Sequence, residues 1–249
     1  MNEISVLTFK NFEPYPEVLC AFSTRLGGYS SEMYTSLNLG LKTGDVVGKV
    51  IKNRQIFFKS LSIKEGRIAY GDQIHSANVA IVNHPGIFHE TDALISSQKN
   101  IFLTVQTADC FPVFLYDPKS ATIGLVHAGW RGTRAGILEN VFNILKHQLK
   151  TEMAHLLAAI GPGLQKECFE VRKDVGALFD EEYLLPHQDS DKKYLDLFRV
   201  IMDRLVNQGI RPENIDAIPA CTMCSQDKFY SYRRDKNTSG RMMGIIGIR

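Results

Sequence analysis

Long apolar runs are absent from this sequence of 249 residues. No uninterrupted apolar stretch approaches the roughly 20 residues that a membrane-spanning helix needs. The first ten residues, MNEISVLTFK, lack the basic segment followed by an apolar segment that marks a secretory signal. The sequence therefore predicts a cytoplasmic protein with no membrane partner.

An excess of charge of either sign is also missing. The chain has 29 Lys and Arg residues against 27 Asp and Glu residues, which leaves a formal net charge of +2. This balance, without long runs of like charge, offers no electrostatic basis for binding nucleic acid or an anionic membrane. We therefore expect neither as a partner.

Cysteine is scarce, and its pattern does not suggest a disulfide framework. The five cysteines are odd in number and irregularly spaced, at positions 20, 110, 168, 221 and 224. A reducing compartment fits this usage better than an oxidising one. Cys221 and Cys224 have the CxxC spacing, but a second CxxC that would complete a structural zinc site is missing.

Apolar residues are plentiful, at 44% of the chain, and can fill a substantial core. Apolar spacings of three and four predict helices over about 45–61, 138–149, 174–179 and 195–208. Short apolar runs predict strands over 68–70, 79–82, 101–105, 156–160, 215–219, 229–232 and 242–248. This irregular alternation predicts a single compact α/β (mixed α+β) domain over residues 1–249, with mixed β-sheets flanked by helices.

The most informative stretch is a predicted antiparallel hairpin. Two β-rich runs, 111–116 and 122–126, flank the polar segment Asp117-Pro118-Lys119-Ser120. A turn of this composition between two such runs is typical of a hairpin. We expect Tyr116 to pair with Ala121 across the turn.

If this pairing continues along both strands, Cys110 lies directly opposite His127 at the open end of the hairpin. Directly opposed residues have Cβ atoms about 4.5–5.5 Å apart, so a thiolate and an imidazole there can share a metal ion or a proton. Pro112 is the weak point, because a bulge at this proline would turn Cys110 to the other face.

Cys110 and His127 support three interpretations. An isolated cysteine is most often buried filler. The pair can also act as a thiolate nucleophile and its base. With His75, which lies in the polar connection Gly71-Asp72-Gln73-Ile74-His75-Ser76, they make the three protein ligands of a catalytic zinc site. Thiolate and imidazole together favour zinc or copper, and the spacing alone does not separate these alternatives.

A series of motifs runs through nearly the whole chain, in the order FSTRLGGYS, SLNLG, GDQIHSANV, TDALIS, TADCFPVFLYDP, GLVHAGWRGT, AAIGPGLQKECFEV, CT and FYSYRRD–GRMMGIIGI. TADCFPVFLYDP followed by HAGWRGT is highly specific. On these motifs the chain resembles the YfiH/YlmD family, also called the laccase-domain or multicopper polyphenol oxidase family, which includes mammalian FAMIN. Cys224 departs from this pattern, since the motif beginning with CT does not require it.

The resemblance implies one α/β unit of mixed sheets with flanking helices. It implies a zinc site and catalytic centre formed by His75, Cys110 and His127. The implied activities are phosphorolysis of adenosine, inosine and S-methyl-5′-thioadenosine, together with deamination of adenosine. The expected partners are therefore small-molecule nucleosides and phosphate, with the protein a monomer or a weak homo-oligomer.

The resemblance also implies substrate contacts. Arg25, in the segment Thr24-Arg25-Leu26-Gly27-Gly28, is implied as a contact for substrate or phosphate. The other expected substrate-site residues lie within the shared motifs and are Asn38, Gln73, Arg131 and Arg234.

Two further functions stay open at this point. One is a metal-free cysteine hydrolase or deamidase that uses Cys110 and His127. The other is a laccase-like polyphenol oxidase with copper as the alternative metal. The chain has too few well-placed histidines for a blue copper site plus a trinuclear cluster.

Overall fold

The computed structural model describes residues 4–249 and contains three β-sheets. Residues 1–3 of the predicted domain lie outside the described part. The first sheet has the order β1-β2-β15-β7-β3-β5, with strands Val6–Leu7, Val18–Ser23, Met242–Ile248, Phe102–Thr107, Ile68–Gly71 and Gly86–Phe88. The second has the order β14-β10-β8-β9-β6-β4, with strands Ile215–Ala217, Leu157–Ile160, Phe111–Asp117, Thr122–Ala128, Ala93–Ser96 and Val79–Ile81. The third joins β11, β13 and β12, which span Glu170–Arg172, Lys192–Leu195 and Leu184–Pro186.

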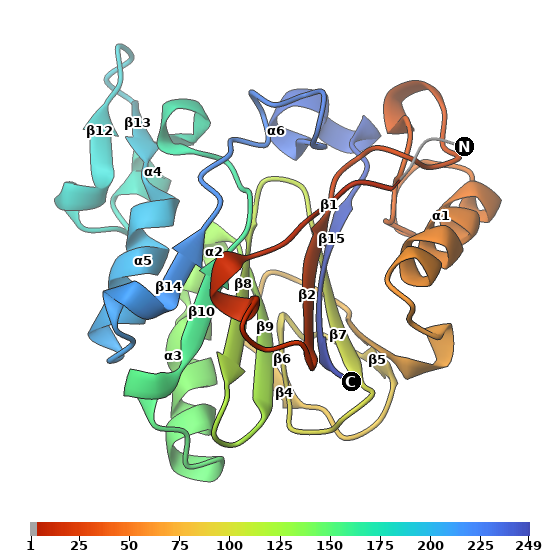
Figure 1. Ribbon diagram of the computed structural model, residues 1–249. Helices are drawn as coiled ribbons and strands as arrows, with labels where there is room; N and C mark the ends of the chain where they lie inside the picture. Colours follow the sequence, from red (N-terminus) through yellow and green to blue (C-terminus); the bar gives the residue numbers. More distant parts are fainter. Residues whose placement is uncertain (1–3) are drawn as a thin grey trace.

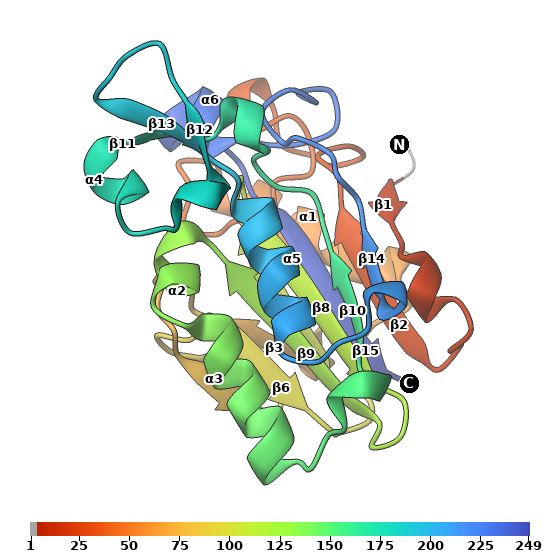
Figure 2. The same ribbon diagram turned by 90° about the vertical axis from the view of Figure 1, so that its left-hand side faces the viewer.

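The two large sheets pack face to face, and helices cover their outer faces (Figures 1 and 2). Helix α1 (Val47–Ser60) packs Phe57 and Phe58 against the outer face of the first sheet. Helices α3 (Ile137–Asn143) and α5 (Leu197–Asn207) share a core with the second sheet. Both sheets contain parallel and antiparallel pairs, so the predicted α/β fold with mixed sheets flanked by helices is confirmed.

The remaining helical segments are short and lie in the connections. The α-helical ones are α2 (Trp130–Arg134), α4 (Lys173–Gly176) and α6 (Tyr232–Asp235), and a π-helical segment, Ile144–Gln148, extends α3. The 3-10 turns are Lys10–Phe12, Glu32–Tyr34, Glu65–Arg67, Met153–His155, Lys166–Cys168, Glu181–Tyr183, Pro212–Asn214 and Lys236–Thr238. Among the described residues, no helix has both the length and the apolar character needed to cross a membrane.

Strands β8 and β9 form the predicted hairpin at the centre of the second sheet, but in a different register. Asp117 pairs with Thr122, and Pro112, not Cys110, lies opposite His127. The prediction that Cys110 directly opposes His127 is therefore wrong by two residues. Because a shift of two positions preserves the face of every side chain, Cys110 and His127 still belong to the same side.

The turn explains the shift. The buried Asp117 carboxylate accepts hydrogen bonds from the backbone N–H of Lys119 at 3.0 Å and from the Ser120 hydroxyl at 2.6 Å. Ala121 has a positive φ of 49°, which closes the turn one residue later than expected. Asp117 thus becomes the last residue of β8 instead of the first residue of the turn. Pro112 pairs with His127 inside the ladder, so the bulge considered at this proline is absent from β8.

The predicted strand over 229–232 is also wrong. Phe229 and Tyr230 are fully buried in a loop, and α6 begins at Tyr232. The backbone N–H of Tyr230 donates to the Met242 sulfur, and its hydroxyl donates to the Tyr34 carbonyl at 2.6 Å. These aromatic rings therefore fill the core from a loop. A short apolar run in the sequence is compatible with such a buried loop as well as with a strand.

Candidate functional site

Three predicted ligands, His75, Cys110 and His127, meet at one end of the two large sheets. One ligand atom from each lies within 4.8 Å of the others. His75 lies in the connection between β3 and β4, Cys110 directly precedes β8, and His127 is the second-last residue of β9. The rings of His75 and His127 have centroids 4.8 Å apart. His127 is buried, Cys110 is half-buried and His75 is exposed, so the group opens to solvent on one side.

Asp92, directly before β6, holds two of these ligands in place. Its fully buried carboxylate accepts a hydrogen bond from His127 Nδ1 at 2.8 Å. It also accepts from the backbone N–H groups of Ile74, His75 and Ser76, at 3.2, 3.0 and 2.7 Å. The hydrogen bond at Nδ1 leaves Nε2 of His127 free to act as a ligand atom. The three backbone hydrogen bonds fix the loop in which His75 has a positive φ of 63°.

Gly129 leaves the space that the ligands occupy. A Cβ atom at this position would lie 2.8 Å from Cys110 Sγ and 2.9 Å from His75 Nδ1. Carbon atoms do not approach sulfur or nitrogen so closely without displacing them. The space beside Gly129 therefore depends on the absence of a side chain.

The environment makes Cys110 and His127 an ion pair. Burial alone would raise the pKa of Cys110, but the charge and hydrogen bond of His127, with a smaller contribution from His75, lower it to about 6. Burial alone would lower the pKa of His127, but Cys110 and Asp92 raise it to about 9. At neutral pH the cysteine is thus a thiolate, the form that binds metals and acts as a nucleophile.

The ligand group lies in the wall of a cavity of about 990 Å³. Six basic residues and only two acidic residues line this cavity, so it favours an anion. The basic residues are Lys42, Arg54, Arg131, Arg233, Lys236 and Arg241. Aromatic side chains, including Trp130 and Tyr232, also line it and offer faces for a flat ring.

Two of the five predicted substrate residues, Gln73 and Arg131, line this cavity. The Gln73 amide donates to the Gln106 carbonyl and accepts from the Gln106 N–H, both at 2.7 Å, so it extends the sheet beyond the end of β3. The guanidinium of Arg131 lies over the Trp130 ring, 4.5 Å from its centroid.

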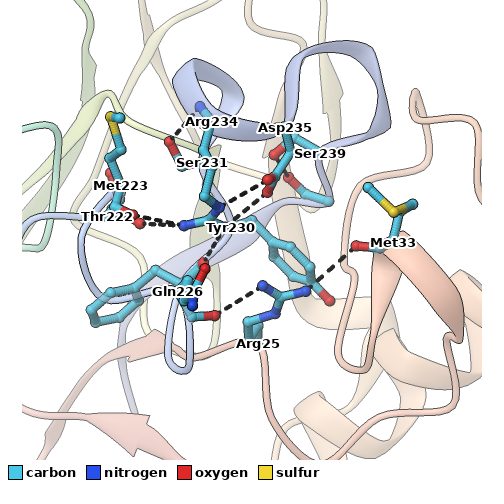
Figure 3. A network of polar contacts seen from close by, with 12 residues as sticks. Arg25, Met33, Thr222, Met223, Gln226, Tyr230, Ser231, Arg234, Asp235 and Ser239 are labelled. Atoms are coloured by element: carbon cyan, nitrogen blue, oxygen red, sulfur yellow. Dashed lines mark hydrogen bonds and ion pairs between the residues drawn. The ribbon is translucent and has the colours of Figure 1, made fainter. Parts of the chain in front are cut away.

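The structure does not bring the other three to the cavity wall. Figure 3 shows that Arg25 lies over the Tyr230 ring and that Arg25 and Arg234 both donate to backbone carbonyls. Buried Asn38 accepts from the backbone N–H groups of Gly40 and Arg241. Arg25, Asn38 and Arg234 thus hold loops together in this structure.

Sequence reasoning missed Asp92, Gly129 and Arg241 as site residues. Asp92 and Arg241 do stand in the quoted motifs TDALIS and GRMMGIIGI, directly before strands, where polar side chains often serve a site. Arg241 lines the same cavity as the ligand group. Burial lowers the pKa of its guanidinium, and the negative charges of Cys110 and Asp109 partly offset this.

Fold and site together define a class: an α/β protein of two packed mixed sheets, with a His₂Cys ligand group in the wall of a basic cavity. Residues 19–249 match the family model described as multi-copper polyphenol oxidoreductase laccase, and the chain belongs to this family.

Named relatives agree with this assignment. The purine nucleoside phosphorylase YlmD of Bacillus subtilis is 31% identical over 248 residues, covering 94% of this chain and 89% of the relative. A purine nucleoside phosphorylase of Deinococcus radiodurans is 34% identical over 233 residues, covering 92% and 88%.

Solved structures show the same fold. A Bacillus licheniformis protein described as hypothetical protein YfiH superposes with a TM-score of 0.90 at 30% identity, covering 95% of both chains. YlmD from Geobacillus stearothermophilus superposes with a TM-score of 0.89 at 28% identity, covering 95% of this chain and 94% of that one. The resemblance to the YfiH/YlmD family is thus confirmed.

Proposed function

We propose that this protein is a zinc-dependent purine nucleoside phosphorylase whose catalytic centre is formed by His75, Cys110 and His127. The proposed substrates are adenosine, inosine and S-methyl-5′-thioadenosine, with hydrolytic deamination of adenosine as a second activity. The observation that carries the proposal is the His₂Cys group in a cavity lined mainly by cations. The names of the relatives at 31% and 34% identity support the nucleoside class.

The three side chains fit a zinc ion by their chemistry. One thiolate and two imidazoles are typical zinc donors, and three protein ligands leave the fourth position open. Asp92 supplies the carboxylate partner that zinc-binding histidines usually have. A bound zinc ion would supply Lewis-acid chemistry at the open position.

The basic residues of the cavity fit the phosphate. In phosphorolysis the bond between C1′ and the purine nitrogen breaks, a phosphate oxygen bonds to C1′, and the purine leaves with a proton. Arg131 and Arg241 are suited to hold the phosphate, because a guanidinium donates two parallel hydrogen bonds to such an anion. Trp130 and Tyr232 can stack on the purine. In deamination, the oxygen of water replaces the amino group at C6, and ammonia leaves.

The decisive experiment incubates the protein with each nucleoside, with and without phosphate, and identifies products by mass spectrometry. We expect free purine and ribose 1-phosphate (or its 5′-methylthio form) only with phosphate, and inosine from adenosine without it. The variants His75→Ala and Cys110→Ala should lose both activities and the bound zinc. His147→Ala is the matched control, because His147 is exposed and outside the cavity. Full activity of zinc-free protein would overturn the zinc mechanism.

Arg131→Gln tests the phosphate contact. One charge-assisted hydrogen bond is worth about 1.5–3 kcal/mol, so the KM for phosphate should rise at least about tenfold. Arg134→Gln is the control, because Arg134 lies on the same short helix α2 but does not line the cavity. An equal effect in both variants would refute a specific role for Arg131.

A metal-free cysteine hydrolase is the second candidate, and one observation favours it. The pKa of Cys110 at about 6 and that of His127 at about 9 give the thiolate–imidazolium pair that such enzymes use. A chelator separates the two, since it should leave a cysteine hydrolase intact and stop the proposed phosphorylase.

A laccase-like copper oxidase is less well supported. Within residues 4–249, the groups with ligand spacing contain two of the seven histidines of the chain, His75 and His127. A blue copper site plus a trinuclear cluster needs more imidazoles than these two.

A further inference from the structure

Three of the remaining cysteines, Cys168, Cys221 and Cys224, lie together on the surface beyond the cavity. Their sulfur atoms all lie within 4.8 Å of one another. The sulfurs of Cys168 and Cys224, 56 positions apart in sequence, are 3.3 Å apart. Cys221 and Cys168 are half-buried and Cys224 is exposed, so an ion can reach the group from solvent.

Two backbone segments bring these cysteines together. Gly163 forms a parallel bridge with Cys221, and the N–H of Thr222 donates to the Gly163 carbonyl at 3.1 Å. The 3-10 turn Lys166–Cys168 begins three residues after Gly163 and brings Cys168 to the CxxC loop. Cys168 thus supplies a third sulfur to the CxxC pair, although it belongs to no second CxxC motif.

The CxxC loop favours a thiolate at Cys221. Burial alone would raise the pKa of this thiol, but the backbone N–H groups of Gln165, Met223 and Cys224, together with the Cys224 thiol, lower it. Burial and the neighbouring sulfurs raise the pKa of Cys168 to about 12. The sulfur atoms of all three residues lie within 4.8 Å of one another, close enough to bind a single ion.

Side-chain hydrogen bonds with Arg234 and Asp109 also hold the CxxC loop in place. Arg234 donates to the carbonyls of Thr222 and Met223, at 3.2 and 2.9 Å, and pairs with Asp235 at 2.8 Å (Figure 3). The Thr222 hydroxyl donates to Asp109 at 2.7 Å, and Asp109 directly precedes Cys110. Support of this kind pre-organises a ligand loop and lowers the cost of binding an ion.

We propose that Cys168, Cys221 and Cys224 form a second metal site, which binds a soft, thiophilic ion, Zn²⁺ or Cu⁺. Three thiolates suit either ion and leave a further position open. A disulfide could join only two of the three sulfurs and would leave the third unused. The site does not depend on the proposed nucleoside activity, and binding releases the protons of the thiols to solvent.

The test counts ions in anaerobic, reduced protein after titration with Zn²⁺ or Cu⁺ and removal of excess. The Cys110→Ala variant disables the first site, and it should still retain about one ion per chain, held by the thiols. Adding Cys224→Ser should lower the ion count at least tenfold. Adding Cys20→Ser instead is the matched control, because Cys20 is buried in β2, outside the group.

A second measurement does not depend on a cysteine variant that folds. Alkylation of the native protein followed by mass spectrometry should show that the bound ion protects Cys168, Cys221 and Cys224 together.

A third measurement uses the Cys110→Ala variant. Cobalt(II) bound to this variant should give the absorption of a three-thiolate complex.

The proposal is overturned if Cys110→Ala retains no ion, if Cys224→Ser leaves its ion count unchanged, or if all three cysteines alkylate equally with and without the ion. One ion in both the wild type and Cys110→Ala would refute the zinc centre of the proposed function. It would leave the three-thiol site standing.

Discussion

At the scale of single residues, Asp92 determines the geometry of the site more than any ligand does. One carboxylate fixes the ring of His127 and three successive N–H groups around His75. Burial alone would raise its pKa, but the hydrogen bonds from His127 and Ser76 lower it to about 2. The loop around His75 is therefore stabilised by the charged form of the Asp92 carboxylate.

Asp92→Asn should therefore destabilise the metal-free protein by roughly 3–5 kcal/mol, the cost of removing one partner from a buried charged pair. Because the pKa of Asp92 lies below its ordinary value, the stabilisation is complete above about pH 4 and is lost as the pH falls towards 2. Urea unfolding of both proteins across this range should show the difference shrinking in acid.

Asp72→Asn is the control for this experiment. Asp72 also lies on the cavity but is partly exposed and paired with Lys42, so its loss should cost less than about 1 kcal/mol. A constant difference between wild type and Asp92→Asn from pH 7 to pH 2 would contradict the role assigned to Asp92.

Gly129→Ala tests the same site by adding only the volume of one methyl group. The added methyl group would lie within 3 Å of both Cys110 Sγ and His75 Nδ1, so the two ligands must separate. We expect zinc affinity to fall about 10–100-fold, as after other disturbances around a metal site. Competition with a chromophoric chelator measures the affinity. Gly48→Ala is the control, because nothing lies within 4 Å of its Cβ position, and unchanged affinity in Gly129→Ala would refute the steric argument.

At the scale of elements, the β8–β9 hairpin shows where sequence reasoning succeeds and where it fails. The apolar runs predict both strands and the side chains that share a face, because the period of two survives the register error. The register itself depends on hydrogen bonds of the Asp117 side chain and on the positive φ of Ala121. Neither property can be recognised from apolar spacing.

Asp117→Ala tests the control of the register by the turn. Its loss leaves the Lys119 N–H without its acceptor and removes one of the two acceptors of the Ser120 hydroxyl, which should cost about 1–3 kcal/mol of stability. Activity per folded molecule should stay unchanged, because the turn lies at the opposite end of the hairpin from His127. Denaturant unfolding and steady-state kinetics provide both measurements.

Lys119→Ala is the matched control in the same turn. Its ion pair with Glu152 is exposed to solvent on both sides and should contribute little to stability. If both variants lose the same stability, the buried carboxylate does not control the turn.

At the scale of the whole molecule, the family and the proximity of His75, Cys110 and His127 could be predicted from the sequence, whereas much of the cavity could not. Most strands with apolar runs can be predicted from the sequence, including β15 with its bounds, but the buried strand β6 (Ala93–Ser96) is missed. The third sheet was missed because its strands, such as Lys192–Leu195, contain many polar residues. Arg25 was placed at the site by its motif, yet its donors are used by backbone carbonyls. These hydrogen bonds join Arg25 to other loops of the chain, so its sequence motif alone does not reveal them.

Removal of the proposed zinc ion should affect the whole molecule. An ion present at 1,000 times its dissociation constant stabilises the folded state by about 4 kcal/mol, so chelation should lower the unfolding midpoint. Trp130, the single tryptophan, lies on the cavity beside the ligand group and should report the loss by a change in fluorescence. His75→Ala should abolish both responses and His147→Ala neither, and an unchanged midpoint after chelation would count against a bound ion.

The central place of β15 has a consequence for the order of events during synthesis. This strand, Met242–Ile248, lies between β2 and β7 and is made later than every other strand. The ligand residues, 75 to 127, are all made more than 100 positions earlier, whereas Arg241 arrives only with β15. The nascent chain therefore contains His75, Cys110 and His127 before β15 can join the first sheet, and Arg241 completes the basic wall of the cavity last.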